Sequence, residues 1–470
     1  MKYIFINQNS NEKGGITTLS EHFHKFEPDS IILNLNADRT DFSDSRRKFV
    51  SADVSHRPDS VSEAISSMVC LLAQEQFLLI PNYGQIAHAS VALVLAENKN
   101  CRILGIAHNN QEAAYEILAN FSLTISQYIA VSKWVLRELS TRVSDKKINY
   151  LYPLTTTSPK PSVHDDDRSL RLIYASRLTN VDKEALRLIP LIKALLNVGL
   201  TFSLDIFGDG PCKNEIQKFL DTLEHVGSKI TMHGDRPQKT IEKAFSKGDI
   251  FVSLSSEEGF GMAIAEAMSA CLVPVIMRFN GGICEILKDG ENSIMLEQKD
   301  FEGFAGKIAE LSKDRQLLRK IKDNARKNIK GFQDEKFFFR TFREIAEACF
   351  REKRPKFTIQ KVTSMDPMNR SLKRVVDKVK KRKLGKVNVF GGGLFGRRFI
   401  DEIRKFGVEI GCIYDSSNKE NGKSYESIIY RSPNQLIDDN PIVVCSIESS
   451  GEIVNFLSAL NVNRSRIIVP

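Results

Sequence analysis

The sequence predicts an α/β protein that is built from parallel sheets and divided into several domains. A chain of 470 residues is too long for one hydrophobic core, and two to three domains are expected. Three successive stretches alternate short apolar runs with segments of helical periodicity. Glycine-containing turns follow several of these runs, at the strand ends where open α/β sheets bind ligands. Together these observations predict three α/β units in a row.

The first unit is expected over residues 1–158. Gly15 stands between its first strand and first helix, where a glycine lets the backbone approach a ligand across a cleft. His108 directly follows the fourth strand, a position that suits either a cleft residue or a structural hydrogen-bonding residue. Strands are predicted at Tyr3–Asn7, Ser30–Leu35, Phe77–Ile80, Arg102–Ala107 and Tyr128–Val131, with helices such as Thr17–Phe26 and Ser60–Gln74 between them.

The second unit is expected over residues 159–350 and opens with a polar loop that contains Asp165, Asp166 and Asp167. These carboxylates do not lie at the tip of an apolar strand, so they are interpreted as solvated, and no metal site is predicted. The unit ends in a helix through Phe337–Phe350. Its strands are predicted at Arg171–Ala175, Phe202–Phe207, Ile230–His233, Ile250–Leu254 and Val273–Met277.

The most informative segment of this unit runs from Glu258 to Glu266. It follows the apolar strand Asp249–Leu254, contains a Gly-Phe-Gly turn and opens an alanine-rich helix. Such a helix start presents free backbone N–H groups and a positive dipole end to an anion. This suits a nucleotide sugar, with the diphosphate on the N–H groups, Glu266 accepting from ribose hydroxyls and Glu258 from the transferred sugar. Alternatively both glutamates are scaffold, because Glu is a good helix former.

Two cations are expected to face the same crevice. The strand Arg171–Ala175 ends just before Arg177, and Lys183 follows six residues later. Ligands in open α/β sheets bind at the carboxyl ends of strands, so both side chains are placed near the Glu258 turn. They are predicted to clamp a diphosphate and to stabilise the charge that develops on a leaving group. The alternative is a solvated turn followed by a lysine on a helix surface.

A basic segment, residues 351–386, separates the second and third units. It contains fourteen Lys or Arg against three Asp or Glu, in a chain of net charge +9. Apolar residues at i, i+3, i+4 and i+7 predict a short amphipathic helix there. Its apolar stripe either packs on a neighbouring domain or lies on an anionic membrane surface. The single aromatic residue, Phe357, offers no stacking platform for nucleic acid. The stripe consists of Leu372, Val375, Val376 and Val379.

The third unit is expected over residues 387–470. The strand Val387–Phe390 leads into a G-x-G-x-x-G sequence and a helix, and a second strand, Ile410–Tyr414, ends at an acidic residue. This is the context of a dinucleotide-binding fingerprint. The unit is too short for the two halves of a complete dinucleotide domain, so a structural or interaction role is the alternative. The residues concerned are Gly391, Gly393, Gly396 and Asp415.

The bulk composition is that of a soluble globular protein, with 42% hydrophobic and 27% charged residues. The N-terminus does not resemble a signal peptide, and no apolar run approaches the roughly 20 residues of a membrane span. The eight cysteines are scattered without a Cys-x-x-Cys pair, which indicates neither a zinc site nor a disulfide framework. A cytoplasmic protein with reduced thiols is therefore expected.

Several motifs stand together in the first two units: Gly14-Gly15, His108, Ala130-Val-Ser132, Arg177 with Lys183, Gly208-Asp-Gly-Pro211, Glu258 with Glu266, and Pro274-Val-Ile276 leading to Asn280-Gly-Gly282. By this combination the sequence resembles, over roughly residues 1–350, the family-4 retaining glycosyltransferases of GT-B fold. That resemblance implies two facing Rossmann-like domains, an acceptor domain followed by a donor domain, with the last helix crossing back. It also implies transfer of a sugar from a nucleotide donor with retention of configuration and without a metal. The third unit lies outside that core and resembles small Rossmann-like modules that accompany some sugar-modifying enzymes.

The resemblance also implies roles for individual residues. By it, Arg177 and Lys183 bind the diphosphate, Glu258 contacts the donor sugar, and His108 is counted with these as catalytic. Gly15 lies near the phosphates and Glu266 takes the ribose, while the N–H groups of three residues hold phosphate: Phe260, Gly261 and Met262. The sequence departs from the family pattern where glycines or a small residue are usual, which is expected to alter donor preference. The departures are Ser176, Glu184 and Cys271.

These observations predict a cytoplasmic, bacterial, retaining hexosyltransferase that requires no metal or other cofactor. It would move a sugar from a UDP- or GDP-sugar to a glycan, lipid-linked or anionic polymer acceptor in surface polysaccharide synthesis. The basic segment would then give peripheral contact with the inner face of the membrane, and a dinucleotide at the third unit is a further hypothesis. One alternative is a GT-B-like epimerase or phosphorylase. Another is a non-enzymatic adaptor that binds membrane or nucleic acid through residues 351–386.

Overall fold

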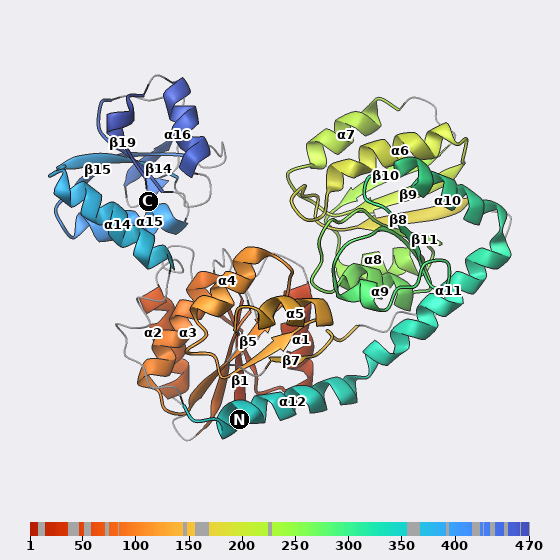
Figure 1. Cartoon of the computed structure of the whole chain (residues 1–470), viewed down its shortest axis with the longest axis horizontal. Helices are drawn as coiled ribbons and strands as arrows, with labels where there is room; N and C mark the ends of the chain where they lie inside the picture. Colours follow the sequence, from red (N-terminus) through yellow and green to blue (C-terminus); the bar gives the residue numbers. More distant parts are fainter. Residues whose placement is uncertain are drawn as a thin grey trace.

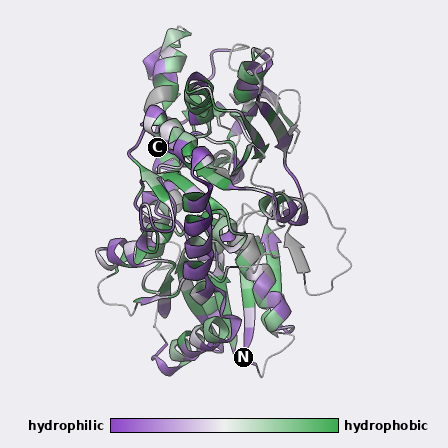
Figure 2. Cartoon of the chain, turned by 90° about the vertical axis from the view of Figure 1, so that its right-hand side faces the viewer, coloured by the Kyte–Doolittle hydropathy of each residue, from purple (hydrophilic) through white to green (hydrophobic). Residues whose placement is uncertain are grey.

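The computed structural model shows three α/β units joined in sequence (Figure 1). Among the residues that the structure describes, no helix is long and apolar enough to cross a membrane. Figure 2 shows hydrophobic residues gathered in the interior and hydrophilic residues on the outward-facing helices. The structure describes residues 1–7, 15–35, 47–50, 58–70, 75–82, 84–143, 148–155, 169–223, 228–354, 367–391, 394–415, 424–425, 427–432, 438–445, 450–460 and 462–469.

The first unit contains a seven-stranded sheet in the order β3-β2-β1-β4-β5-β6-β7, and each neighbouring pair is parallel. The order reverses between β1 and β4, which opens a crevice at their carboxyl ends. Its strands are β1 (Lys2–Asn7), β2 (Ile31–Leu35), β3 (Arg47–Val50), β4 (Phe77–Pro81), β5 (Cys101–Ala107), β6 (Gln127–Ala130) and β7 (Ile148–Tyr150). Its helices are α1 (Gly15–Phe26), α2 (Pro58–Cys70), α3 (Gln85–Glu97), α4 (Glu112–Asn120) and α5 (Lys133–Ser140).

The second unit contains a six-stranded parallel sheet in the order β10-β9-β8-β11-β12-β13. Its order reverses between β8 and β11, so the segments after these two strands lie beside the crevice. The strands are β8 (Leu170–Ala175), β9 (Phe202–Phe207), β10 (Lys229–Gly234), β11 (Ile250–Ser253), β12 (Val273–Met277) and β13 (Ile294–Leu296). The helices are η1 (Ala185–Arg187), α6 (Leu188–Asn197), α7 (Lys213–Asp221), α8 (Gln238–Phe245), α9 (Met262–Ser269), η2 (Gly282–Glu285), α10 (Phe301–Lys313), α11 (Arg315–Ile329) and η3 (Lys330–Gln333).

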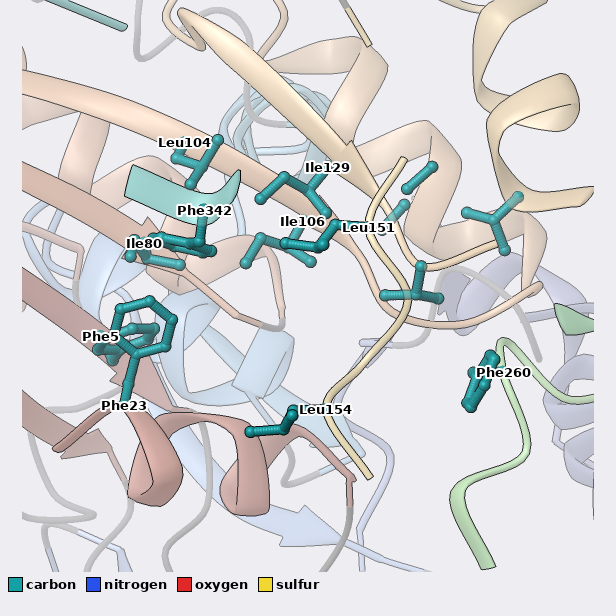
Figure 3. Packing of buried hydrophobic residues seen from close by; sticks show 14 of the residues in the cluster. Phe5, Phe23, Ile80, Leu104, Ile106, Ile129, Leu151, Leu154, Phe260 and Phe342 are labelled. Atoms are coloured by element: carbon teal, nitrogen blue, oxygen red, sulfur yellow. The ribbon is translucent and has the colours of Figure 1, made fainter. Parts of the chain in front are cut away.

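Helix α12 (Glu335–Arg351) returns from the second unit to the first, as Figure 1 shows. Phe342 of this helix packs on Phe23 of α1 with ring centroids 4.2 Å apart, and on Tyr3 of β1 at 6.0 Å. Figure 3 shows Phe342 close to Ile80 and to the pair formed by Phe5 and Phe23. The last helix of the second unit therefore completes the core of the first, as the resemblance implied.

The third unit has a sheet in the order β16-β17-β15-β14-β18-β19, parallel except for the β16–β17 pair. Its core clusters contain only residues of the unit itself, from Leu372 onward. The strands are β14 (Lys386–Phe390), β15 (Glu409–Tyr414), β16 (Ser424–Tyr425), β17 (Ile428–Arg431), β18 (Ile442–Val444) and β19 (Ile467–Ile468). The helices are α14 (Pro367–Lys381), α15 (Leu394–Arg404), α16 (Ser450–Ala459) and η5 (Arg464–Arg466).

Helix α14 is the amphipathic helix of the basic segment, and the structure settles what its apolar stripe contacts. The four stripe residues are at most 8% exposed and pack against α15 and the third sheet. Of the two alternatives, packing of the stripe on a neighbouring domain is confirmed, because the stripe belongs to the core of the third unit, and placement of the stripe on a membrane is wrong. The exposed face of the helix is mostly basic, with Lys373, Arg374, Lys380 and Lys381 beside Asp377.

Candidate donor-binding site

The carboxyl edges of the first two sheets meet at the Glu258 turn. A Cβ added to Gly259 would lie 2.0 Å from the carbonyl oxygen of His108, in the segment after β5. A Cβ on Gly282 would lie 2.6 Å from the Cβ of Ser132, in the segment after β6. Only glycine permits backbones to approach this closely. Strand ends from both units therefore line one interdomain site.

Four charged side chains at the β8–β11 switch point form a connected network. Lys183 Nζ lies 2.7 Å from Glu258 Oε1, and Arg177 Nη2 donates to Asp182 Oδ2 at 2.8 Å. Lys183 Nζ also lies 3.8 Å from Asp182 Oδ2. The Lys183 and Glu258 side chains are only 13% and 18% exposed, whereas that of Arg177 is 54% exposed. The structure thus brings the predicted cations and Glu258 together and adds Asp182 between them.

Hydrogen bonds from neighbouring hydroxyls hold both carboxylates in place. The Ser255 hydroxyl donates to Glu258 Oε1 at 3.0 Å, and the Thr179 hydroxyl donates to Asp182 Oδ1 at 2.9 Å. The backbone N–H of Ser256 donates to the carbonyl oxygen of Asp182 at 3.0 Å. The segments after β8 and β11 are therefore tied to each other as well as to the sheet.

The turn before α9 has the backbone shape that the glycines predicted. Gly261 is the N-cap residue with φ 101°, a left-handed value that favours glycine. The N–H groups of Gly282 and Ile283 donate to the carbonyl oxygens of Gly259 and Phe260, at 2.9 and 2.6 Å. These two hydrogen bonds fix the shape of the turn. The first N–H groups of α9, starting at Met262, have no partner within the helix and can bind an anion.

Glu266 lies on α9, one helical turn beyond the anion site. Its half-buried carboxylate accepts a hydrogen bond from Gln238 Nε2 at 3.4 Å. Burial raises the pKa of Glu266 to about 7, with Gln238 lowering it and Glu242 raising it to a smaller extent. A carboxylate whose charge is this poorly solvated gains from hydroxyl donors such as those of a ribose.

His108 takes part in a polar chain at the crevice of the first unit. Its Nε2 lies 3.1 Å from Asn82 Oδ1, Asn82 Nδ2 donates to Asn7 Oδ1 at 2.8 Å, and Asn7 Nδ2 donates to the Ser20 hydroxyl at 3.0 Å. Burial, and then the charge of His88, lower the pKa of His108 to about 3. The ring is therefore neutral at physiological pH and serves as a hydrogen-bonding group. Gly15, at the first position of α1, begins the helix that follows β1 at this same edge.

Two of the three departures from the pattern that the resemblance implies have backbone conformations that favour glycine. Glu184 has φ 49° and Cys271 has φ 63°. Glu184 also pairs with Arg187 at 3.3 Å, which gives its side chain a structural contact. Ser176 differs, because the glycine that allows close approach is on the neighbouring segment. A Cβ on Gly208 would lie 1.8 Å from the Ser176 carbonyl oxygen.

The third-unit fingerprint also has the packing that its glycines predicted. Gly391 has φ 99°, and a Cβ on Gly396 would lie 2.0 Å from the Gly391 carbonyl oxygen, so α15 approaches the turn as closely as a glycine allows. Asp415 follows β15 directly, and its N–H donates to the Arg431 carbonyl oxygen at 3.1 Å. Gly393 lies outside the described residues.

Several residues of the interdomain site were not predicted. Asp182 could have been found from its place beside Lys183, and Asn7 and Asn82 from their positions at the ends of β1 and β4. Glu285 carried no sequence signal, because its partners come from distant segments. Among the described residues, no group of three or more His, Cys, Asp or Glu could hold a metal ion.

Comparison with known proteins finds a family whose model matches the middle of the chain. Residues 157–328 match the family described as Glycosyl transferases group 1. N-acetyl-alpha-D-glucosaminyl L-malate synthase of Bacillus anthracis is 32% identical over 132 residues, 28% of this chain and 34% of that protein. The capsular polysaccharide biosynthesis glycosyltransferase CapM of Staphylococcus aureus is 28% identical over 160 residues, 34% of this chain and 40% of that protein. The chain thus spans well under half the length of these curated relatives.

Solved structures resemble a larger part of the chain. HepE of Anabaena in complex with UDP-glucose has a TM-score of 0.59 and 18% sequence identity, and covers 75% of this chain and 100% of its own. A mutant of S. aureus TarM, in complex with Fondaparinux, alpha-GlcNAc-glycerol and UDP, has a TM-score of 0.59 and 13% sequence identity, and the match covers 73% of this chain and 99% of TarM. The chain therefore has the GT-B fold, two facing Rossmann-like domains, followed by a third, smaller α/β domain.

Proposed function

We propose that the chain is a retaining, metal-independent hexosyltransferase of the family-4 type that uses a nucleotide-diphosphate sugar. The observation that carries the proposal is the Lys183–Glu258 pair, 2.7 Å apart, at the topological switch point and beside the N-terminus of α9. The cation and the start of the helix suit the diphosphate of such a donor, and the carboxylate can accept hydrogen bonds from its sugar hydroxyls.

In this proposal the chain's own groups act by positioning and by charge. Arg177 and Lys183 hold the diphosphate and stabilise the negative charge that grows on it as the glycosidic bond breaks. Glu258 accepts hydroxyl hydrogen bonds from the sugar, and Glu266 accepts those of the ribose. Asp182 and Glu258 are each paired with a cation, which favours attack on the same face as the leaving phosphate over a covalent enzyme intermediate.

The acceptor is proposed to be a glycan, a lipid-linked saccharide or an anionic polymer of the cell surface. The CapM likeness supports polysaccharide synthesis, and the UDP bound by HepE and TarM supports a uridine nucleotide over the GDP alternative. The exposed basic face of α14 supports an anionic partner, either the acceptor itself or the inner face of a membrane.

A second function is proposed for the third unit, namely binding of a nucleotide or dinucleotide at the β14–α15 turn. The observation that favours it is the contact between Gly396 and the Gly391 carbonyl, with Asp415 at the end of β15. In a nucleotide-binding half-domain, these positions lie under a diphosphate and beside a ribose.

The test is the release of nucleoside diphosphate from a panel of UDP-, GDP- and ADP-sugars, with and without a membrane-lipid and polysaccharide fraction. We expect release from one donor, dependent on the acceptor fraction, and at least tenfold slower in Glu258→Gln than in the control variant Glu302→Gln on α10. Conversion of the donor into another nucleotide sugar without any acceptor and without net release of nucleoside diphosphate would favour an epimerase, and release dependent on inorganic phosphate a phosphorylase. Turnover that survives Glu258→Gln unchanged would refute the proposed site.

A further inference from the structure

We propose that Glu285 is a positioning residue that holds the two domains closed over the donor turn. Only the predicted effect of Glu285 on turnover rests on the proposed function. Glu285 ends the short helix η2 of the second unit, and each oxygen of its exposed carboxylate contacts a segment outside that unit's sheet.

The first contact caps a helix of the other domain. Glu285 Oε1 accepts a hydrogen bond from the backbone N–H of Trp134 at 2.8 Å, in the first turn of α5. The next N–H, that of Val135, donates to the Ser132 hydroxyl at 3.1 Å. The first N–H groups of a helix have no intrahelical partner, and the helix dipole favours an anion there. The second domain thus supplies a charged cap that α5 does not have in its own sequence.

The second contact reaches the connection between the domains. Tyr152, in the segment that leaves the first domain, donates its hydroxyl hydrogen to Glu285 Oε2 at 2.7 Å. Burial and then the Glu285 carboxylate raise the pKa of the Tyr152 hydroxyl, so it remains a donor. The Tyr152 ring also packs on Phe332 of η3, in the returning connection, with centroids 4.9 Å apart.

The same tyrosine contacts the turn that is proposed to bind phosphate. The ring centroids of Tyr152 and Phe260 are 5.5 Å apart, and those of Phe260 and Phe332 are 6.2 Å apart. Phe260 is 3% exposed, and a Cβ added to Gly282, on the same η2 helix as Glu285, would lie 2.7 Å from the Phe260 ring and 2.6 Å from the Cβ of Ser132. The Glu285 carboxylate therefore contacts helix α5 and Tyr152 directly. Through the Tyr152 ring it is linked to η3, in the returning connection, and to the donor turn.

This arrangement couples closure of the domains to the shape of the donor turn. If the domains separate, Glu285 loses the Trp134 N–H, and Tyr152 is no longer held against Phe260. Without the carboxylate, the closed arrangement loses a charge-assisted hydrogen bond at the N-terminus of α5. The expected consequence is slower transfer with little change in nucleotide affinity, because the donor groups Lys183 and Glu266 lie within the second domain.

The test compares hydrogen exchange at single amides in the full-length protein and in Glu285→Ala. We expect the Trp134 amide to exchange at least tenfold faster in the variant, while the Val135 amide, held by Ser132 within the same helix, changes less than twofold. Tyr152→Phe, which keeps the ring but removes the hydroxyl, should give a smaller increase of the same sign. Glu291→Ala, in an exposed turn of the same domain, is the control and should change neither amide.

Two further readouts separate positioning from folding. In Glu285→Ala, kcat is expected to fall at least fivefold while the Kd for UDP changes less than twofold, and X-ray scattering should show a larger radius of gyration at unchanged Tm. An unchanged Trp134 exchange rate, or unchanged kcat despite faster exchange, would overturn the inference. Failure of the wild-type protein to bind any nucleoside diphosphate would instead refute the proposed function, while exchange and scattering would still decide whether Glu285 holds the domains together.

Discussion

Glu266 shows how a binding residue can lower the stability of the fold that contains it. Its folded-state pKa of about 7 lies above the value of roughly 4.3 for an exposed Glu. The folded protein therefore binds this proton more tightly than the unfolded chain does. The resulting stabilisation is complete below about pH 4 and is lost as the pH rises to about 7.

We predict that Glu266→Gln raises the free energy of unfolding of the second domain at pH 8 by about 1–2 kcal/mol, a figure reduced for the partial exposure of the side chain. No gain is expected at pH 4.5, where Glu266 is protonated. The same variant should bind nucleotide more weakly, because an amide accepts ribose hydroxyls less well than a carboxylate. Calorimetric melting at the two pH values checks this, and an equal gain at both would contradict the assigned pKa.

Among the secondary-structure elements, the junction of β8 and β9 depends most strongly on one glycine. A Cβ on Gly208 would lie 1.8 Å from the Ser176 carbonyl oxygen, and its φ of 131° is unfavourable for other residues. Gly208→Ala is predicted to destabilise the second domain by about 2–4 kcal/mol, because neither backbone can move without breaking the sheet. The matched control is Gly306→Ala in α10, where a Cβ meets nothing within 4 Å and a gain of about 0.5–1 kcal/mol is expected. Denaturant titration compares the two, and equal effects would refute the steric argument.

The C-terminus of α14 offers a stabilising substitution. Lys383 has φ 53°, its N–H donates to the Lys380 carbonyl, and the Leu384 N–H donates to the Val379 carbonyl. This is a Schellman motif in which glycine is the preferred residue at the position of Lys383. Lys383→Gly is predicted to stabilise the third unit by about 0.5–1 kcal/mol, measured by its thermal transition. A lower transition temperature would show that the lysine side chain contributes more than its backbone costs.

The sequence predicted the central strands of the second unit, including β8 and β11 that carry the site, to within one residue at each end. Both β9 and β12 were predicted at their observed boundaries, because β12 is a continuous apolar run and β9 alternates apolar with polar residues. The edge strand β3, with the sequence Arg-Lys-Phe-Val, and the three-residue β7 were missed, because edge strands carry no comparable apolar signal.

The candidate site was predictable where its residues follow the carboxyl ends of strands, because open α/β sheets bind ligands there. That rule predicted that Lys183 lies near Glu258, and Lys183 Nζ lies 2.7 Å from Glu258 Oε1. It could not predict Glu285, whose partners Trp134 and Tyr152 depend on how two domains approach each other. It also left the stripe of α14 undecided, because amphipathic periodicity indicates a buried face but not what covers it.

The molecule as a whole consists of two interdependent domains and one that is separate. Helix α12 packs Phe342 into the first core, and the largest apolar cluster contains residues of the first two sheets together with this helix. The clusters of the third unit contain none of those residues. Residues 1–354 should therefore fold alone.

We predict that a chain ending at Arg354 binds nucleoside diphosphate with a Kd within twofold of that of the full-length protein. The reason is that every residue of the proposed donor site, and the helix that closes the first core, is retained. Insolubility of the shortened chain would show that the third unit supports the fold. A large loss of affinity in a soluble shortened chain would place part of the nucleotide site in the third unit.

The most direct measurement is calorimetric binding of UDP, GDP and ADP to the wild-type protein, to Lys183→Met and to the control variant Lys193→Met on α6. The wild type and the control should bind one nucleotide equally well. Lys183→Met should bind it at least tenfold more weakly, about 1.4 kcal/mol, because the diphosphate loses its cation and Glu258 is left unpaired. Equal binding by all three proteins would mean that the Lys183–Glu258 pair is scaffold, and the assignment of a donor site at the β8–β11 switch point would be wrong.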